Sequence, residues 1–386
     1  MYILYLQHYF FVVYYVIIDL RSEIDMGYKI MHRDKLIALA DNSGITELIE
    51  KSLCPSCFVV GMPIEIWLDN RTVDIHRSHS RKLFKALRLR TPDDIEQVID
   101  IGHGISITDN WWIQKSDENL DYRSLKKYNE ELSDIAFYGA SVSNSGDTSG
   151  YKELGTVGSY EKAWRYINGT WYMFKQGNTQ ELISEYYSYL FLKALEVNVA
   201  EYELKAYTSE ETGITSHFIV SKDFTNNANV DFEPFCNYFH DHDEPEYIIP
   251  KLKEIDSSLV TSYVMMVFYD ALLHNDDRHN QNAGVLRNST TGEIIGLAPL
   301  FDYNLGLIST GIPRIDNEKG NIFTDSFLAN DVCRKVLKDN LPDRNKIISA
   351  INSTYKGINS TGYFGFSPVP IENYIIDTYD YLAKHI

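Results

Sequence analysis

The chain has 386 residues and 44% of them are hydrophobic, which is enough for a globular core in two or three domains or lobes of ordinary size. Its net charge of −18 argues against direct nucleic-acid contact, because a surplus of carboxylates repels phosphate. Four cysteines are too few for a disulfide scaffold, which favours a reducing, cytoplasmic location.

Residues 1–27 form an apolar leader whose status the sequence leaves open. The first 18 residues are almost all apolar or aromatic, yet they fall short of a typical membrane span of ~20 residues and include Gln7 and His8. They also lack the basic region and cleavage site of a signal peptide. A membrane segment, an ordered strand and a non-native leader before a start at Met26 or Met31 are the alternatives, and membrane association is expected only if the leader is a genuine anchor.

Residues 28–100 are expected to form a small α+β N-terminal module. Residues 57–60 and 64–68 are apolar runs with the character of strands. A basic run follows at residues 76–90, and its helical spacing favours a solvated helix face over a phosphate or DNA site.

Cys54 and Cys57 stand in a Cys-x-x-Cys arrangement within this module. A zinc site needs a second pair of ligands, and only the loose pair His76 and His79 offers one. Two ordinary thiols at a turn are the alternative interpretation, and a redox pair is disfavoured without a surrounding βαβ pattern.

Residues 101–225 are expected to form a nucleotide-binding N-lobe. Residues 102–112 resemble a strand that enters this lobe, and residues 138–150 are a Ser/Gly-rich flexible loop. Residues 217–224 begin apolar and become polar, which suits a hinge strand where adenine would bond to backbone groups.

A candidate phosphate-binding loop comes after the Ser/Gly-rich segment. Gly158 stands between the hydroxyl residues Thr156 and Ser159, and Lys162 follows. This composition is typical of a loop whose backbone N–H groups approach phosphate.

A strand and a helix supply the next pair of candidates. Residues 171–175 are a β-type run that ends in Lys175, and residues 181–195 carry apolar side chains at helical spacing. A strand lysine and a glutamate on the following helix form the ion pair that positions nucleotide phosphates in kinases. We choose Lys175 and Glu185, with Glu181 as the competitor, since either glutamate could instead be a solvated residue of the first turns.

Residues 226–386 are expected to form a mainly helical catalytic C-lobe, in which a buried helix at residues 257–273 leads into the richest motif of the chain. Asp277 can accept the proton of an acceptor hydroxyl. The Asn282 amide oxygen and the Asp302 carboxylate can hold Mg²⁺ against nucleotide phosphates. These residue types at these positions indicate phosphoryl transfer from Mg·ATP.

Two details support this choice. If the adjacent Asp276 were the base, the residue five positions on would be Gln281. Its side chain is longer than that of asparagine and would hold the metal at a different depth in the site. Residues 283–287 and 294–298 flank a turn-rich segment and predict a β-hairpin, which would return Asp302 toward the catalytic loop. A plain hydrophilic turn is the alternative for the whole motif.

The order of these features resembles the HipA-like serine/threonine kinases. The similarity runs from about Ser106 to near the C-terminus, and its specific part extends from Asp277 to Asp302. It implies an α+β, two-lobed protein-kinase-like fold, ATP and Mg²⁺ as cofactors, a protein substrate with a Ser or Thr acceptor, and an inhibitory partner protein. One departure is the segment after Asp302, which is Tyr-Asn-Leu-Gly where ordinary protein kinases have Phe-Gly. The activation-segment switch of those kinases is therefore not assumed.

The resemblance assigns the base to Asp277, the metal ligands to Asn282 and Asp302, and the phosphate contact to Lys175. It also adds His279, within the Asp-Arg-His sequence, to the nucleotide-binding residues.

Three functions stay under consideration: a protein Ser/Thr kinase, a phosphoinositide or small-molecule kinase, and a catalytically silent nucleotide-binding interaction module. The catalytic loop also resembles that of phosphoinositide kinases, which keeps the second open. The resemblance further suggests autophosphorylation. A phosphate on Thr156 or Ser159 would add about −1.5 to −2 charges beside the nucleotide phosphates and switch the enzyme off. The alternative is that both are ordinary turn hydroxyls that bond to the backbone.

Overall fold

The computed structural model describes residues 27–71, 99–100, 102–125, 130–138, 161–208, 215–311, 327–361 and 368–386. Outside the described residues lie the apolar leader up to residue 26, the basic run at residues 76–90 and nearly all of the Ser/Gly-rich loop. The candidate phosphate-loop residues Thr156, Gly158 and Ser159 also lie outside them.

The N-terminal part is built on an antiparallel sheet with the strand order β3-β2-β1-β4. Its buried side chains form a core of their own, in which Trp67, Trp111 and Ile30 are almost completely enclosed. The elements of this part are β1 (Tyr28–His32), β2 (Lys35–Asp41), β3 (Gly44–Leu48), η1 (Lys51–Leu53), α2 (Ile64–Leu68), η2 (Asp69–Arg71), β4 (Trp111–Lys115) and α5 (Tyr122–Leu125). The next helix, α6 (Glu130–Tyr138), contacts the second sheet instead.

Two expectations for this part are wrong. Residues 57–60 form turns, and residues 64–68 form the short helix α2, in which the buried residues Ile64, Trp67 and Leu68 follow i, i+3, i+4 spacing. A short apolar run fits the two-residue period of a strand as well as the helical period.

The strand expected at residues 102–112 begins only at Trp111. His103 and Gly104 turn the backbone with φ of 50° and 59°, which interrupts any earlier strand. β4 then pairs with β1, with Trp111 opposite His32, so this strand joins the N-terminal sheet.

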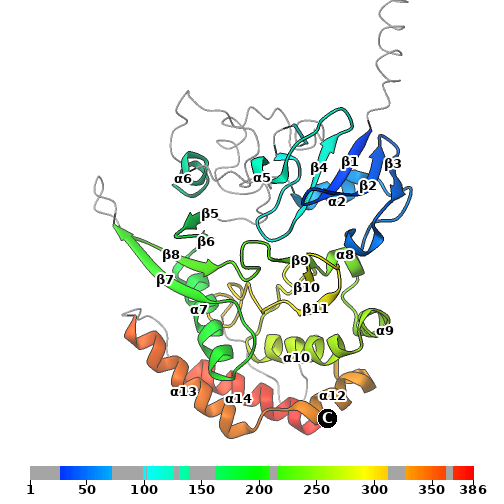
Figure 1. The fold of residues 1–386 in the computed structure, drawn as a ribbon. Coiled ribbons are helices and arrows are strands. Elements are labelled where there is room, and N and C mark those ends of the chain that lie inside the picture. Colours follow the sequence, from blue (N-terminus) through cyan, green and yellow to red (C-terminus); the bar gives the residue numbers. More distant parts are fainter. Residues whose placement is uncertain are drawn as a thin grey trace, which may run out of the picture.

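The next sheet has the order β5-β6-β8-β7, with every neighbouring pair antiparallel. Its strands are β5 (Lys162–Ile167), β6 (Thr170–Gln176), β7 (Tyr202–Thr208) and β8 (Thr215–Lys222), and helix α7 (Thr179–Ala194) contacts β7 and β8. The strand predicted at residues 171–175, the helix at 181–195 and the strand at 217–224 are therefore present. Figure 1 shows this sheet between the N-terminal part and the helices.

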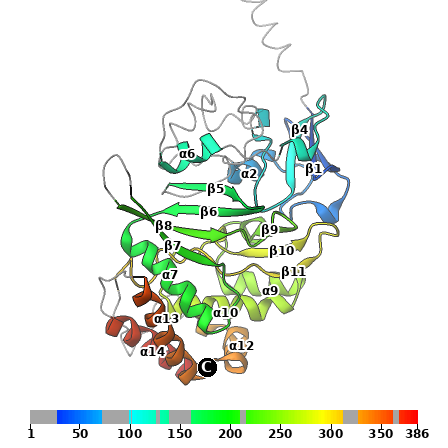
Figure 2. The same ribbon diagram turned by 60° about the vertical axis from the view of Figure 1, so that its left-hand side comes forward.

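The remaining part is mainly helical, as expected, and carries the small sheet β11-β10-β9. Its elements are β9 (Val230–Pro234), α8 (Cys236–Phe239), α9 (Pro245–Ile255), α10 (Ser258–Leu272), β10 (Gly284–Asn288), β11 (Ile294–Leu297), α12 (Asp331–Asn340), α13 (Arg344–Ser360) and α14 (Pro368–His385). The predicted hairpin is present as β10 and β11. In Figure 2 the β11-β10-β9 sheet lies beside the β5-β6-β8-β7 sheet, and helices α10, α13 and α14 lie below them.

Helix α10 is apolar around most of its circumference and is buried in the main core, where it contacts α9, α12 and α14. Asp270 is the exception in this helix, since it is 1% exposed. A buried carboxylate requires a partner, and α10 leads into the segment that supplies it.

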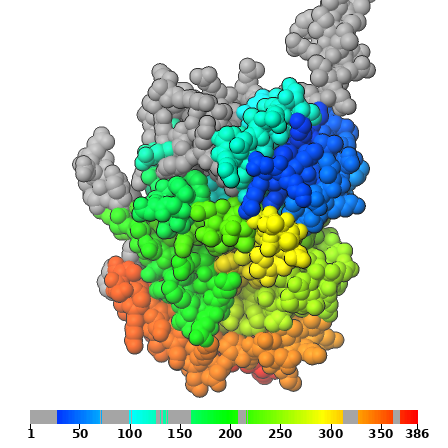
Figure 3. All heavy atoms as spheres, viewed as in Figure 1, coloured from blue at the N-terminus to red at the C-terminus, as the bar shows by residue number. Residues whose placement is uncertain are grey.

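A buried ion pair joins the N-terminal part to the β9-β10-β11 sheet. Arg287 Nη1 lies 2.7 Å from Glu233 Oε2 and also donates to the carbonyl of Cys54, while Nη2 donates to the carbonyl of Ser52. Ser56 N donates to the other oxygen of Glu233 at 2.5 Å. Figure 3 shows the N-terminal part, in blue, directly against the β10–β11 region, in yellow.

Candidate active site

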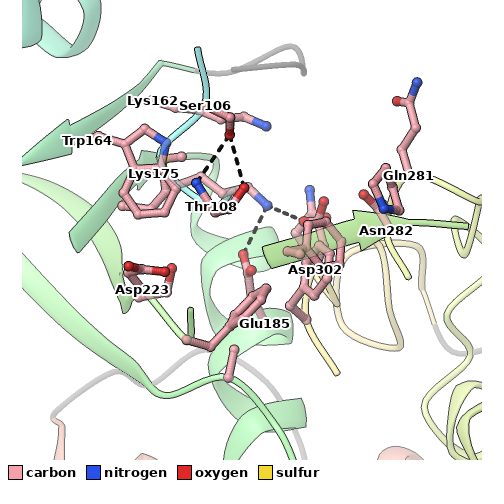
Figure 4. Close-up of a pocket in the computed structure, with 18 of the residues that line it drawn as sticks. Ser106, Thr108, Lys162, Trp164, Lys175, Glu185, Asp223, Gln281, Asn282 and Asp302 are labelled. Carbon is pink, nitrogen blue, oxygen red and sulfur yellow. Dashed lines mark hydrogen bonds and ion pairs between the residues drawn. The ribbon is translucent and has the colours of Figure 1, made fainter. Parts of the chain in front are cut away.

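A cavity of about 690 Å³ contains the predicted site residues. It lies where the β5-β6-β8-β7 sheet, the catalytic loop and the segment that ends in Asp302 meet, and Figure 4 shows Lys175, Glu185 and Asp302 directed toward one another in it. All seven of the candidate residues that the structure describes line it: Lys162, Lys175, Glu185, Asp277, His279, Asn282 and Asp302.

The ammonium group of Lys175 is shared by two carboxylates. Its Nζ lies 2.5 Å from Asp302 Oδ1 and 3.1 Å from Glu185 Oε2 (Figure 4). The Lys175 and Glu185 side chains are 11% and 3% exposed. The charges therefore interact where water screens them little.

One ammonium cannot neutralise two carboxylates, and the pKa values reflect this. Burial alone would raise the pKa of Asp302, but Lys175, Lys162 and Arg278 outweigh it and hold that pKa well below its usual range. Burial raises the pKa of Glu185, and Lys175 offsets only part of that rise. Burial would lower the pKa of Lys175, yet the two carboxylates raise it. Asp302 is thus the carboxylate held as an anion.

Glu181, the competitor of Glu185, has a different role. Asn178 caps α7 by accepting a hydrogen bond from Glu181 N at 2.9 Å, and its amide donates to Glu181 Oε1 at 2.7 Å. The first bond satisfies a free N–H at the helix start, and the second holds the Glu181 carboxylate at the Asn178 side chain. Glu185, one turn further along α7, is the glutamate that meets Lys175.

Asp277 and Asp276 are separated by their surroundings. Asp277 lines the cavity, and its backbone carbonyl accepts a hydrogen bond from His279 N at 2.9 Å. Asp276 is exposed, and its carboxylate lies 3.3 Å from His274 Nε2. This arrangement favours Asp277 as the residue able to meet an acceptor in the cavity.

Asp302 has a backbone conformation that few residues other than glycine adopt. Its φ is 60°, in the left-handed region, where asparagine and aspartate are among the more frequent non-glycine residues. Its N–H donates to Tyr202 Oη at 3.2 Å, and the preceding chain is tied to residue 198 and residue 200 through the backbone of Leu300. Such strain persists only when surrounding contacts hold it, and it is concentrated at functional sites.

Arg278 is the principal residue that the sequence analysis missed. Its Nε and Nη2 both lie 3.0 Å from the carboxylate of Asp270, and its Nη1 donates to the carbonyls of Asn282 at 2.5 Å and Phe301 at 2.7 Å. The guanidinium also lies 4.7 Å from the ring centre of Tyr303. One side chain thus joins α10, the catalytic loop and the residue before Asp302.

Five further residues line the cavity that the sequence analysis did not single out, although it placed three of them within the expected nucleotide-binding lobe. Ser106, Thr108 and Asp109 line it, together with Trp67 and Arg71. The sequence signal for the segment from Ile105 to Asp109 is its alternation of polar and apolar residues. This alternation does not show which part of the chain the polar side chains face.

The four cysteines are free. Burial raises the pKa of Cys54 to about 11 and that of Cys57 to about 12, so both thiols are protonated at neutral pH. Among the described residues no group of three His, Cys, Asp or Glu side chains is arranged to hold a metal ion. His76 and His79, the other half of the zinc hypothesis, lie outside those residues.

Among the described residues, every helix is too short or too polar to span a membrane.

The solved structures that resemble this chain include two kinases. HipA of Shewanella oneidensis MR-1, solved as a toxin–antitoxin complex with HipB and operator DNA, is 10% identical with a TM-score of 0.51, over 92% of this chain and 97% of its own. The proinflammatory kinase CtkA of Helicobacter pylori is 21% identical with a TM-score of 0.42, over 58% of this chain and 90% of its own. No protein-family model and no curated protein sequence matches the chain.

The fold and the arrangement of the cavity define the class, an α+β protein with two kinase-like lobes. The likeness to the Shewanella structure extends over nearly all of both chains, and the chain has the HipA-like fold. The predicted resemblance to HipA-like kinases is confirmed at the level of fold.

Proposed function

We propose that this chain is a protein kinase that uses Mg·ATP and transfers the γ-phosphate to a Ser or Thr hydroxyl. The observation that carries the proposal is the Lys175 ammonium between Glu185 and Asp302, in one cavity with Asp277 and Asn282. A phosphoryl-transfer site needs a cation for the phosphates, oxygen ligands for a metal and a carboxylate for the acceptor. These side chains supply all three.

The residues fit a magnesium ion. Asn282 and Asp302 offer amide and carboxylate oxygens, the donors that this hard cation prefers, and the lowered pKa of Asp302 keeps its carboxylate ionised. Asn282 is 8% exposed and is held through its backbone by Arg278. Bound Mg²⁺ would neutralise charge on the phosphate oxygens.

The protein's own groups perform the other tasks. Lys175, with Lys162 and His279, would bind phosphate oxygens, and Glu185 would orient Lys175. Thr156, Gly158 and Ser159 are proposed to cover the phosphates through backbone N–H groups. Asp277 would accept the proton of the acceptor hydroxyl. The rings of Phe224 and Phe301 line the same cavity, which suits an adenine base.

The protein acceptor is proposed ahead of a lipid or small molecule because the fold is HipA-like, although the chemistry at the γ-phosphate is common to both. An inhibitory partner protein is proposed because the HipA of known structure was solved with HipB. We propose no direct nucleic-acid contact, given the net charge of −18, and a cytoplasmic location, given four free thiols.

The test is incubation of the purified chain with radiolabelled ATP and Mg²⁺ in three arms: protein alone, cell lysate, and phosphoinositide-containing vesicles. We expect label on protein in the lysate, on Ser or Thr after acid hydrolysis. Label confined to the vesicles would identify a lipid kinase instead. No label in any arm, with ATP still bound, would support the silent nucleotide-binding module.

A further inference from the structure

A short segment of the N-terminal part presents two hydroxyls to the cavity. From Ile105 to Thr108 the side chains alternate in burial, with Ile105 and Ile107 each 2% exposed and Ser106 and Thr108 half-buried. Both hydroxyl residues line the cavity. The isoleucines face the protein interior, and so the alternation fixes which side chains face the site.

The segment is held firmly on both sides. The carbonyl of Thr108 accepts a hydrogen bond from Phe232 N at 2.9 Å, which attaches it to β9. Asp109 receives Arg71 Nη2 at 2.7 Å and the N–H of Trp111 at 2.9 Å. The Ser106 and Thr108 hydroxyls lie 3.0 Å apart, and Thr108 N donates to Ser106 Oγ at 3.2 Å. The bond between the two hydroxyls uses one of their two hydrogens, so a ligand that accepts from both hydroxyls would replace this bond.

The electrostatics of the cavity select the kind of ligand. Lys162 and Lys175 line the same cavity, and both contribute to the lowered pKa of Asp302. Figure 4 draws Ser106 and Thr108 over the part of the cavity that carries these two lysines. Hydroxyls beside ammonium groups are donors suited to an anion with several oxygens, and phosphate is such an anion.

We propose that Ser106 and Thr108 donate hydrogen bonds to the phosphate oxygens of the bound nucleotide. The N-terminal part then takes part in nucleotide binding, and the nucleotide bridges it to the lobe that carries Lys175. This proposal rests on the proposed function, since it requires that the cavity bind a nucleotide.

The test compares the affinities of ATP, ADP and adenosine for the wild-type chain and for the double variant Ser106→Ala/Thr108→Val by calorimetry. Two hydrogen bonds to a charged group are lost, and so ATP or ADP affinity should fall about tenfold or more. Adenosine has no phosphate, and its affinity should stay unchanged. The variant Thr108→Ser keeps a hydroxyl and should retain most of the wild-type ATP affinity.

The matched control is Ser43→Ala/Thr290→Val, which removes two exposed hydroxyls outside the cavity and should leave all three affinities unchanged. Equal losses for ATP and adenosine would overturn the proposal, because a general distortion of the cavity would then explain them. Unchanged ATP affinity, or phosphate found on Ser106 or Thr108 by mass spectrometry after incubation with Mg·ATP, would also overturn it. A wild-type chain that binds no ATP would instead refute the proposed function itself.

Discussion

Replacing Arg278 by lysine tests how the site is held together. The substitution keeps a positive charge opposite Asp270, whose side chain is fully buried. It removes the planar guanidinium group, whose N–H donors point in several fixed directions. Arg278 makes four hydrogen bonds, two to the Asp270 carboxylate and one each to the carbonyls of Asn282 and Phe301. A lysine can keep the ion pair with Asp270 but cannot also donate hydrogen bonds to both carbonyls.

The cost follows from the acceptors that lose their donors. A buried polar group left unsatisfied costs about 1–3 kcal/mol, and two such carbonyls give about 2–6 kcal/mol. We expect the lower half of that range, about 2–4 kcal/mol, because the ammonium can reach one of the two in some rotamers. The same loss frees the backbone of Asn282 and of the residue before Asp302. The Mg²⁺ concentration needed for half-maximal ATP binding should therefore rise several-fold.

The assay is urea unfolding together with ATP titration at several Mg²⁺ concentrations. Arg344→Lys is the control, since Arg344 makes the same bidentate contact with Asp380 but both side chains are 47% exposed. An exposed pair contributes about 0–1 kcal/mol, and its loss should not affect Mg²⁺ dependence. If Arg278→Lys behaves like this control in both measurements, Arg278 does not position the site.

Two further predictions concern the carboxylates around Lys175. Asp302→Asn should weaken ATP binding in the presence of Mg²⁺ far more than in its absence, because a neutral amide replaces the anionic ligand. Calorimetry with and without Mg²⁺ measures this difference. An unchanged Mg²⁺ dependence would show that Asp302 is not a metal ligand. Glu185→Gln should flatten stability against pH. Burial raises the pKa of Glu185 above its ordinary 4.5, so the folded chain holds this proton more tightly than the unfolded chain, and stability is lost as pH rises through that range. Urea unfolding between about pH 5 and pH 8 should show a smaller decline in the variant than in the wild type, and parallel curves would contradict the assigned shift.

The sequence predicted those features that depend on neighbouring residues. The β10–β11 hairpin and helices α7 and α10 follow from turn residues and hydrophobic spacing within short windows. The sequence also predicted the pair of Lys175 and Glu185, which the structure contains, but it placed Asp302 only near the catalytic loop and did not predict its contact with Lys175. Their chemical roles stay predictions.

Features that depend on distant residues were missed. β4 pairs with β1 across some eighty residues, and nothing in the sequence of β4 identifies that partner. Arg278 stands inside the recognised motif, but its importance depends on a buried aspartate in the preceding helix and on the carbonyl of Phe301. The short run at residues 64–68 was misread because five apolar-rich residues suit a strand or a helix equally.

The most direct test of the central claim is phosphoryl transfer by Asp277→Asn measured beside its ATP affinity. We expect transfer from radiolabelled ATP to a protein acceptor to be abolished, with ATP affinity nearly unchanged, because Asp277 acts on the acceptor hydroxyl and is not a principal metal ligand. Asp276→Asn, the exposed neighbour, should retain transfer. Transfer reduced only a few-fold in Asp277→Asn, or abolished equally in Asp276→Asn, would contradict the assignment of the catalytic base.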